Sequence, residues 1–168
     1  MLAHMPPSPI PPAAGQESVW DYPRPPVVEP VAARLRVVLA GTTVADTTSG
    51  LRVLETSHPP NYYFPPGDIT PGVLVGSARR SYCEFKGVAT YCSVVTGGRH
   101  EVDAAWSYPR PVSGYEALAG HVAFYATRMD ECWVGEELAR AQPGGFYGGW
   151  VTTTVVGPFK GVPGSAGW

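Results

Sequence analysis

Short runs in which apolar and polar residues alternate recur along most of the chain, separated by glycine or proline. The first is Arg34–Leu39, which is followed across a glycine by the β-rich run Thr42–Asp46. A second turn leads into Leu51–Thr56, where the alternation has a period of two residues. Paired β-rich runs are typical of a hairpin, and alternation at period two is typical of a half-buried strand. We therefore expect ordered structure to start at Arg34.

The same pattern continues through the second half of the chain. The strongest hairpin is expected from residues 81–86 and 88–96, and Tyr115–Ala119 is long enough for a single helical turn. Further strands are expected at Arg99–Ser107, Gly120–Tyr125, Glu131–Val134 and Trp150–Val156. Several short strands at close spacing predict a mostly β fold with little helix, arranged as a sandwich, a barrel or a folded-over sheet.

The strongest hairpin can be aligned residue by residue. If Gly87 and Val88 form a two-residue loop, Gly87 supplies the positive φ of a type II′ turn. Cys83 then lies opposite Cys92, at a position where the two side chains of a pair approach each other closely. Two interpretations of these cysteines remain: a redox or metal-binding pair, or two small buried thiols.

Glycine and proline interrupt the chain unusually often, with 20 glycines and 19 prolines among 168 residues. Residues 1–16 are rich in Pro, Ala and Ser without periodicity, which predicts a disordered tail. Trp20–Pro23 carries aromatic side chains that are costly to leave in water, so we expect it to dock on the folded body. The predicted organisation is a single domain over residues 17–161, followed by a flexible tail at residues 162–168.

Charge and cysteine content argue against several classes of protein. Twelve basic and 14 acidic residues give a formal net charge of −2, which argues against nucleic-acid binding. No run reaches the roughly 18 apolar residues of a membrane helix, and the chain starts without the features of a signal peptide. Three cysteines without a Cys-x-x-Cys pair fit neither a disulfide framework nor a zinc site. These features predict a cytoplasmic protein with reduced thiols and no membrane contact.

The densest group of polar and aromatic residues lies between Glu55 and Tyr63. It follows the end of a strand and contains Pro59-Pro60, so its side chains have little conformational freedom. Glu55 and His58 are candidates for a catalytic acid–base pair, with Ser57 or a tyrosine hydroxyl placing the substrate. The alternative is structural, with Glu55 hydrogen-bonded to loop amides beside a buried His58.

Two other charged groups are candidates for chemistry. Lys86, next to the tight turn, is either a Schiff-base or phosphate-binding lysine, or a hairpin-end charge paired to an acid. Glu101 and Asp103 fall on one strand face, as a magnesium site requires, although such pairs are more often solvated. No phosphate-binding Gly-x-x-x-x-Gly-Lys motif occurs, and the glycine-rich segment Gly144–Gly149 has no lysine.

Four ordered motifs resemble a known protein family. They are Val53–Pro60 followed by Tyr62-Tyr63, then Cys83–Ala89, Ala104–Pro109 and Gly120–Tyr125. Over about residues 17–161 the chain is similar to the domain of unknown function 427 (DUF427) family. The resemblance implies a small β domain whose antiparallel sheets fold over each other like a tent.

Similar β-tents occur in methionine sulfoxide reductases of the B type and in the thalidomide-binding domain of cereblon, where paired Cys-x-x-Cys motifs hold zinc. This sequence lacks those motifs, so no zinc is expected and the cofactor is unknown. The analogy with cereblon implies an aromatic cage for a small molecule, formed by Tyr62, Trp106, Tyr108 and Tyr125. The complete set of expected ligand-binding residues is Ser57, Tyr62, Tyr63, Cys83, Lys86, Trp106, Tyr108 and Tyr125.

Three hypotheses of function follow. The leading one is a small-molecule pocket between the sheets, in which Glu55 and His58 act as the acid–base pair if it catalyses a reaction. The second is a protein-interaction module whose Pro-rich segment, residues 1–30, binds another chain. The third follows from a nucleotidyltransferase-like label that some catalogues attach to the family; it requires magnesium and a nucleoside triphosphate, and the expected Gly-Ser and Asp-x-Asp signature is absent here.

Overall fold

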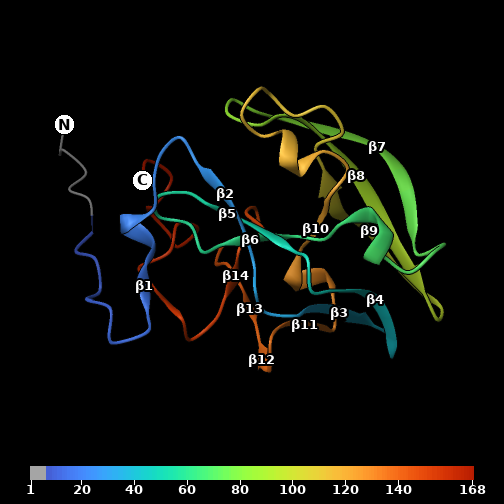
Figure 1. The fold of residues 1–168 in the computed structure, drawn as a ribbon, viewed down its shortest axis with the longest axis horizontal. Helices are drawn as coiled ribbons and strands as arrows, with labels where there is room; N and C mark the ends of the chain where they lie inside the picture. Colours follow the sequence, from blue (N-terminus) through green and yellow to red (C-terminus); the bar gives the residue numbers. More distant parts are fainter. Residues whose placement is uncertain (1–6) are drawn as a thin grey trace.

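The computed structural model describes residues 7–168, and the protein is mostly β (Figure 1). Antiparallel sheets make up most of it, so the mostly β fold that the sequence predicts is confirmed. Helical structure within the described range consists of short 3₁₀ turns: η1 (Val19–Asp21), η2 (Pro66–Asp68), η3 (Glu116–Leu118) and η4 (Ala126–Arg128). No helix in residues 7–168 is long and apolar enough to cross a membrane.

Two four-stranded antiparallel sheets form the larger part of the fold. The first, in the order β10-β9-β8-β7, contains β7 (Leu74–Cys83), β8 (Gly87–Thr96), β9 (Arg99–Ser107) and β10 (Val122–Phe124). The second, in the order β12-β11-β3-β4, contains β3 (Leu35–Leu39), β4 (Thr42–Thr47), β11 (Glu131–Val134) and β12 (Glu137–Leu138). Figure 1 shows the first sheet above the second.

Smaller sheets connect the ends of the chain to this body. A three-stranded sheet has the order β2-β5-β6, with β2 (Val27–Pro30), β5 (Leu51–Leu54) and β6 (Asn61–Tyr63). The remaining pairs are β1 (Glu17–Ser18) with β15 (Val155–Val156), which run parallel, and β13 (Arg140–Ala141) with β14 (Trp150–Val151). A bridge between Phe64 and Val122 joins the end of β6 to β10.

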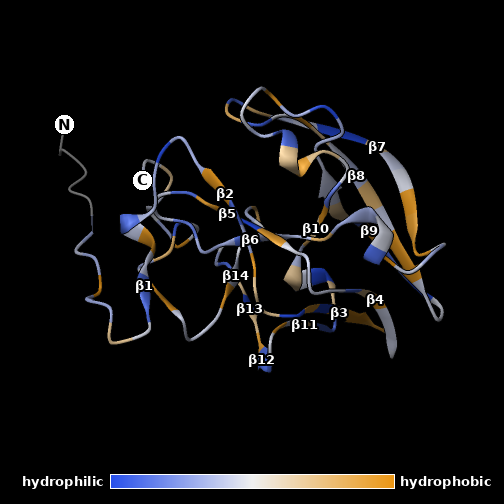
Figure 2. Cartoon of the chain, viewed as in Figure 1, coloured by the Kyte–Doolittle hydropathy of each residue, from blue (hydrophilic) through white to orange (hydrophobic). Residues whose placement is uncertain are grey.

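The main apolar core lies between the two four-stranded sheets. Burial alternates along β3, so Leu35, Val37 and Leu39 point to one side and are fully buried. They pack with buried residues of the first sheet, among them Val94 and Phe124. Figure 2 shows apolar residues on strands of both sheets. Apolar area removed from water by two facing sheets is the main contribution that holds them together.

A second apolar cluster forms where the first sheet meets the three-stranded sheet. It includes Tyr63 from β6, Tyr91 from β8 and Trp106 from β9. Tyr91 and Trp106 are direct partners across the β8–β9 ladder, which places their side chains on the same face of the sheet. This cluster forms one wall of the pocket described below.

Ordered structure begins before Arg34, contrary to the expectation from the pattern. β1 and β2 precede that residue, and β2 pairs with β5 at an edge of its sheet. An edge strand has one side without ladder hydrogen bonds, so Pro30 is tolerated there. The density of prolines in residues 23–30 concealed this strand in the sequence. Several other expected elements are confirmed: the Arg34–Asp46 hairpin as β3–β4, and η3, β9, β10 and β11.

The expected register of the β7–β8 hairpin is wrong. Cys83 pairs with Gly87, so the turn contains three residues, 84–86, rather than the two residues Gly87-Val88. Gly87 does adopt a positive φ of 109°, but as the first residue of β8. The longer turn is held from outside by the Val112 N–H, which donates a hydrogen bond to Lys86 O (2.9 Å). A shift of register further along β7 places Cys92 opposite Gly76, so the two cysteines are not neighbours.

Both ends of the described chain contact the body. Trp20–Pro23 docks as expected, with Tyr22 buried and Trp20 Nε1 donating a hydrogen bond to Pro158 O (2.9 Å). Upstream, the Ile10 N–H donates to Gly157 O (2.8 Å). The Trp168 ring lies edge-on to Trp20 at a centroid distance of 5.4 Å. Residues 1–6 of the proposed tail lie outside the described residues, and the domain limits 17–161 stay a prediction.

The register predicts that Cys83 and Cys92 do not form a disulfide within one chain. Gly87, the partner of Cys83, is five residues from Cys92 along β8, which corresponds to about 17 Å of strand. Disulfides require Cα atoms within about 7 Å. We expect mild oxidation followed by digestion and mass spectrometry to yield no peptide joined through these two residues. Recovery of that peptide from monomeric protein would contradict the register.

Candidate functional site

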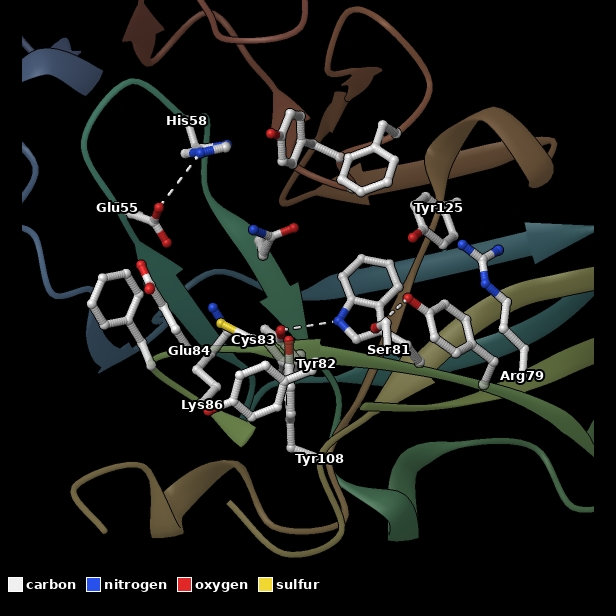
Figure 3. A pocket seen from close by; sticks show the side chains of 18 residues that line it. Glu55, His58, Arg79, Ser81, Tyr82, Cys83, Glu84, Lys86, Tyr108 and Tyr125 are labelled. Atoms are coloured by element: carbon white, nitrogen blue, oxygen red, sulfur yellow. Dashed lines mark hydrogen bonds and ion pairs between the residues drawn. The ribbon is translucent and has the colours of Figure 1, made fainter. Parts of the chain in front are cut away.

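A pocket of about 460 Å³ lies between β7 and the second apolar cluster, where the loop after β5 and the segment 146–148 also reach it (Figure 3). Half of its 18 lining residues are Phe, Tyr or Trp. The lining residues are Glu55, His58, Asn61, Tyr63, Arg79, Ser81, Tyr82, Cys83, Glu84, Phe85, Lys86, Tyr91, Trp106, Tyr108, Tyr125, Phe146, Tyr147 and Gly148.

The loop between β5 and β6 places the polar groups at one end of the pocket. Ser57 is fully buried at its centre and has a positive φ of 73°. Its N–H donates to Val19 O (3.0 Å), and its carbonyl accepts from the Lys160 N–H (2.9 Å). The loop is therefore fixed by segments near both ends of the chain, and Glu55 and His58 are held at the pocket.

Gln142 determines which nitrogen of His58 carries the proton. The Gln142 amide oxygen accepts the Gly149 N–H (3.0 Å), which fixes the orientation of the amide. Its Nε2 then donates one hydrogen to Lys160 O (2.8 Å) and the other to His58 Nδ1 (3.0 Å). Because Nδ1 accepts a hydrogen bond, the proton of the neutral ring lies on Nε2.

His58 is neutral at ordinary pH. Burial lowers its pKa to about 4, and the positive charges of Lys160, Arg24 and Lys86 act in the same direction. Its Nε2 lies 3.5 Å from Glu55 Oε2, so this contact is between a neutral imidazole and a carboxylate. Gln142 occupies Nδ1, and Nε2 is directed at Glu55. His58 is therefore a positioning residue, and Glu55 is the group of the expected pair with acceptor capacity left for a bound molecule.

Aromatic rings build the opposite wall. Trp106 Nε1 donates to the Tyr63 hydroxyl (3.2 Å), and the Trp106 ring lies 4.6 Å from the Tyr125 ring at an angle of 48°. Burial raises the pKa of Tyr63 and Tyr108, and that of Tyr125 to about 12, so these hydroxyls stay neutral. Gly148 closes the wall from the other side, since a Cβ there would lie 2.1 Å from Trp106 Cη2.

Two cations occupy opposite ends of the pocket (Figure 3). Arg79 is exposed, and its guanidinium carbon lies 4.4 Å from the centre of the Tyr91 ring. Lys86 is only 8% exposed, and its amine lies 5.7 Å from the centre of the Tyr108 ring. The sequence also allowed Lys86 to pair with an acid at the hairpin end, but within residues 7–168 Lys86 forms no ion pair. The amine instead faces the pocket.

Eight of the ten residues proposed from the sequence line this pocket: Glu55, His58, Tyr63, Cys83, Lys86, Trp106, Tyr108 and Tyr125. Ser57 and Tyr62 do not. Ser57 is turned into the protein, where its Oγ has no hydrogen-bond partner. Tyr62 points to the other side of β6 from Tyr63 and packs on Trp150 in the main core, because neighbouring residues of a strand alternate faces.

Other lining residues were not foreseen. Arg79, Ser81 and Cys83 follow one another at every second position of β7, so they share a face; this alternation was present in the sequence. Asn61 begins β6, and its buried Oδ1 has no partner. Tyr147 lies beside His58, with the ring centroids 4.8 Å apart. No local sequence pattern predicts this contact.

The proposed magnesium carboxylates lie elsewhere. Glu101 forms ion pairs with Arg99 (2.8 Å) and Arg128 (3.1 Å). Asp103 has a positive φ of 51° and a buried Oδ1 without a hydrogen-bond partner. Over residues 7–168 no three His, Cys, Asp or Glu side chains gather closely enough to hold a metal ion.

The depressed pKa of His58 predicts a loss of stability as the pH falls. His58 binds a proton near pH 6.5 in the unfolded chain and only near pH 4 in the folded protein. The stabilisation that comes from keeping His58 neutral is therefore complete above pH 6.5 and is lost as the pH falls to about 4. In the wild type we expect the free energy of unfolding to fall by about 3 kcal/mol across this window, and we expect His58→Gln to lack this fall. Urea denaturation at a series of pH values measures it. His100→Gln, at an exposed histidine, should show the same dependence of stability on pH as the wild type. The same dependence in His58→Gln would contradict the lowered pKa of His58.

Comparison with known proteins identifies the family to which the chain belongs. No curated protein matches the chain. One family model, described as Domain of unknown function (DUF427), matches residues 27–135, which is more than half of the chain. The match includes Glu55, His58, Lys86 and Trp106, whereas Gln142 and Gly148 lie beyond it. The chain therefore belongs to the DUF427 family, as its sequence motifs indicated.

Proposed function

We propose that this protein binds a small organic molecule in the aromatic pocket. The observation that carries the proposal is a pair of polar groups at the pocket that lack protein partners. Within residues 7–168, the Lys86 amine has no hydrogen-bond or ion-pair partner, and neither has the buried Asn61 Oδ1. Buried polar groups of native proteins are nearly always hydrogen-bonded, so a bound molecule is the natural complement.

The size and walls of the pocket support the same proposal. Small-molecule sites usually have volumes of about 300–1,000 Å³ and are lined mostly by apolar and aromatic groups with a few polar ones. The volume of about 460 Å³ and the Trp106–Tyr125 pair fit that description. We also propose that the protein works in the cytoplasm, because its three cysteines are free, as expected in a reducing compartment.

Proton transfer by Glu55 is a second candidate function at the same site. Glu55 is held by His58 Nε2 (3.5 Å) and Arg24 Nη2 (3.7 Å), and its carboxylate lines the pocket. A carboxylate fixed in this way at a largely aromatic cavity is suited to act as a general base. His58 keeps the carboxylate in place and does not exchange protons with the bound molecule.

Loss of the aromatic wall should abolish binding. We expect native mass spectrometry of the protein purified from its own host to show added mass that disappears under denaturing conditions. Trp106→Ala should lose this mass because it removes the ring at the centre of the wall. Trp133→Ala, a tryptophan of β11 that does not line the pocket, is the matched control and should keep it.

A bare chain mass for the wild type would count against the pocket and favour the hypothesis of an interaction module. Equal retention of the added mass in Trp106→Ala, with the fold confirmed by circular dichroism, would place the bound molecule elsewhere.

Catalysis by Glu55 makes a separate prediction. We expect the wild type, incubated in D₂O, to exchange a carbon-bound hydrogen of the bound molecule for solvent deuterium, because the base removes a proton and solvent returns a deuteron, and Glu55→Gln to bind this molecule without exchange. Liquid chromatography with mass spectrometry follows both species. Glu84→Gln, at an exposed carboxylate of the pocket, is the control and should behave as the wild type. Exchange by Glu55→Gln would rule out this role.

A further inference from the structure

We infer that the ligand is an anionic aromatic molecule, a flat ring system carrying a carboxylate, phosphate or sulfonate group, and that Lys86 binds this group. The inference rests on the proposed function and specifies the chemistry of its ligand. It derives from the charges around Lys86 and from the shape of the aromatic wall.

Lys86 has a largely buried side chain whose amine has no counter-charge. It is 92% buried, yet no carboxylate lies within 4.0 Å of its amine in the described part of the chain. The hydrogen bond between Lys86 O and the Val112 N–H fixes the backbone from which the side chain extends into the pocket. An ammonium group removed from water is stabilised when an opposite charge or acceptors replace the lost water. The ring of Tyr108, 5.7 Å away, supplies only a partial substitute.

The two acids at this end of the pocket do not neutralise Lys86. Glu55 is in contact with Arg24 and with His58, which turn its carboxylate toward themselves. Glu84 is exposed on the β7–β8 turn, where water solvates it. Both lie near Lys86 in Figure 3, but neither is within ion-pair distance of its amine.

Positive side chains outnumber negative ones at this end of the pocket, with Lys86, Arg24 and Lys160 near two carboxylates. His58, on the same side of the pocket, has its pKa lowered first by burial and then by the charges of Lys160, Arg24 and Lys86. Three cations therefore act on one point of the pocket wall. The neighbouring tyrosines stay neutral, so the negative charges at this end are those of Glu55, which contacts Arg24 and His58, and of Glu84, which is exposed. An anionic group of a ligand is favoured here and a cationic group is opposed.

The remaining wall selects a flat ring. The Trp106 and Tyr125 rings lie 4.6 Å apart, and Gly148 allows the chain to approach the Trp106 ring from the far side. Beside this packed pair, Tyr82 and Phe146 line the pocket with exposed rings, and exposed aromatic rings stack on planar molecules. Asn61 adds a buried amide oxygen that can accept a hydrogen bond from a polar edge of such a ring.

Arg79 is a weaker candidate for the anionic group. Its guanidinium stacks on Tyr91 and is exposed to solvent, so salt and water screen its charge. Lys86 and Arg79 lie at opposite ends of the pocket (Figure 3), so substitutions of the two cations report on different positions.

The test compares two fluorescent probes that share one ring system. The anionic probe is 8-anilinonaphthalene-1-sulfonate, and N-phenyl-1-naphthylamine is the same molecule without the sulfonate. Lys86→Met removes the charge and keeps the length of the side chain. We expect this substitution to lower the affinity for the anionic probe by about tenfold or more, as for loss of a charge-assisted hydrogen bond. The affinity for the neutral probe should change by less than about twofold. Arg79→Met and Arg140→Met, the latter at an exposed arginine away from the pocket, should change neither affinity by more than about twofold.

A second measurement uses the wild type alone. The chain has only two lysines, Lys86 and Lys160. We expect saturating anionic probe to slow acetylation of Lys86 by acetic anhydride relative to Lys160, as read by peptide mass spectrometry, and the neutral probe to slow it less.

The outcomes separate the inference from the function on which it rests. If both probes bind the wild type with similar affinity and Lys86→Met affects them equally, the pocket remains a binding site and the assignment to Lys86 is wrong. An effect of Arg79→Met larger than that of Lys86→Met also overturns the assignment. If neither probe binds, or if Trp106→Ala retains both, the small-molecule pocket itself is rejected.

Discussion

The geometry of the pocket depends on two backbone hydrogen bonds at Ser57. Its N–H binds a carbonyl near the start of the described chain, and its carbonyl binds an N–H near the end. Ser57 adopts a positive φ, which costs free energy for a residue with a side chain, and these two bonds stabilise that conformation. The loop between β5 and β6 is thereby fixed, and the placement of Glu55 and His58 follows from it.

The same constraint explains why His58 differs from the acid–base group that its sequence context suggests. Once the loop is fixed, His58 is buried against Gln142, and the amide of Gln142 occupies one ring nitrogen. Glu55 faces the other nitrogen. The histidine is then a neutral hydrogen-bonding link between the C-terminal part of the chain and the carboxylate. The proton position on its ring is determined by Gln142, 84 residues away.

Local pattern predicted the elements that depend on neighbouring residues. The β3–β4 hairpin and β9 follow from alternation and from the turn residues between them. The β7–β8 register did not follow, because the three-residue turn is stabilised by a hydrogen bond from Val112, which is remote in the sequence. β2 was concealed by its prolines, since nothing local reveals that it lies at the edge of a sheet.

The residues of the candidate site also divide into those that the local sequence pattern predicts and those that it does not. Glu55, His58 and Lys86 stand out because polar and aromatic residues are dense around them, and they do line one pocket. Tyr62 was misplaced because two adjacent tyrosines point to opposite faces, and the sequence does not say which one faces the cavity. Tyr147 and Gly148 belong to a glycine-rich segment with no periodicity, and only tertiary packing brings them to Trp106.

The pocket is assembled from two portions of the chain, of which one lies within the family match and the other lies beyond it. The sheet that carries Lys86 and Trp106 lies within the stretch matched by the family model, whereas Tyr147 and Gly148 lie beyond it. The 146–148 segment contributes a wall without contributing a strand. A side chain at position 148 would meet the Trp106 ring, so the shape of the cavity is coupled to a segment that has no strand of its own.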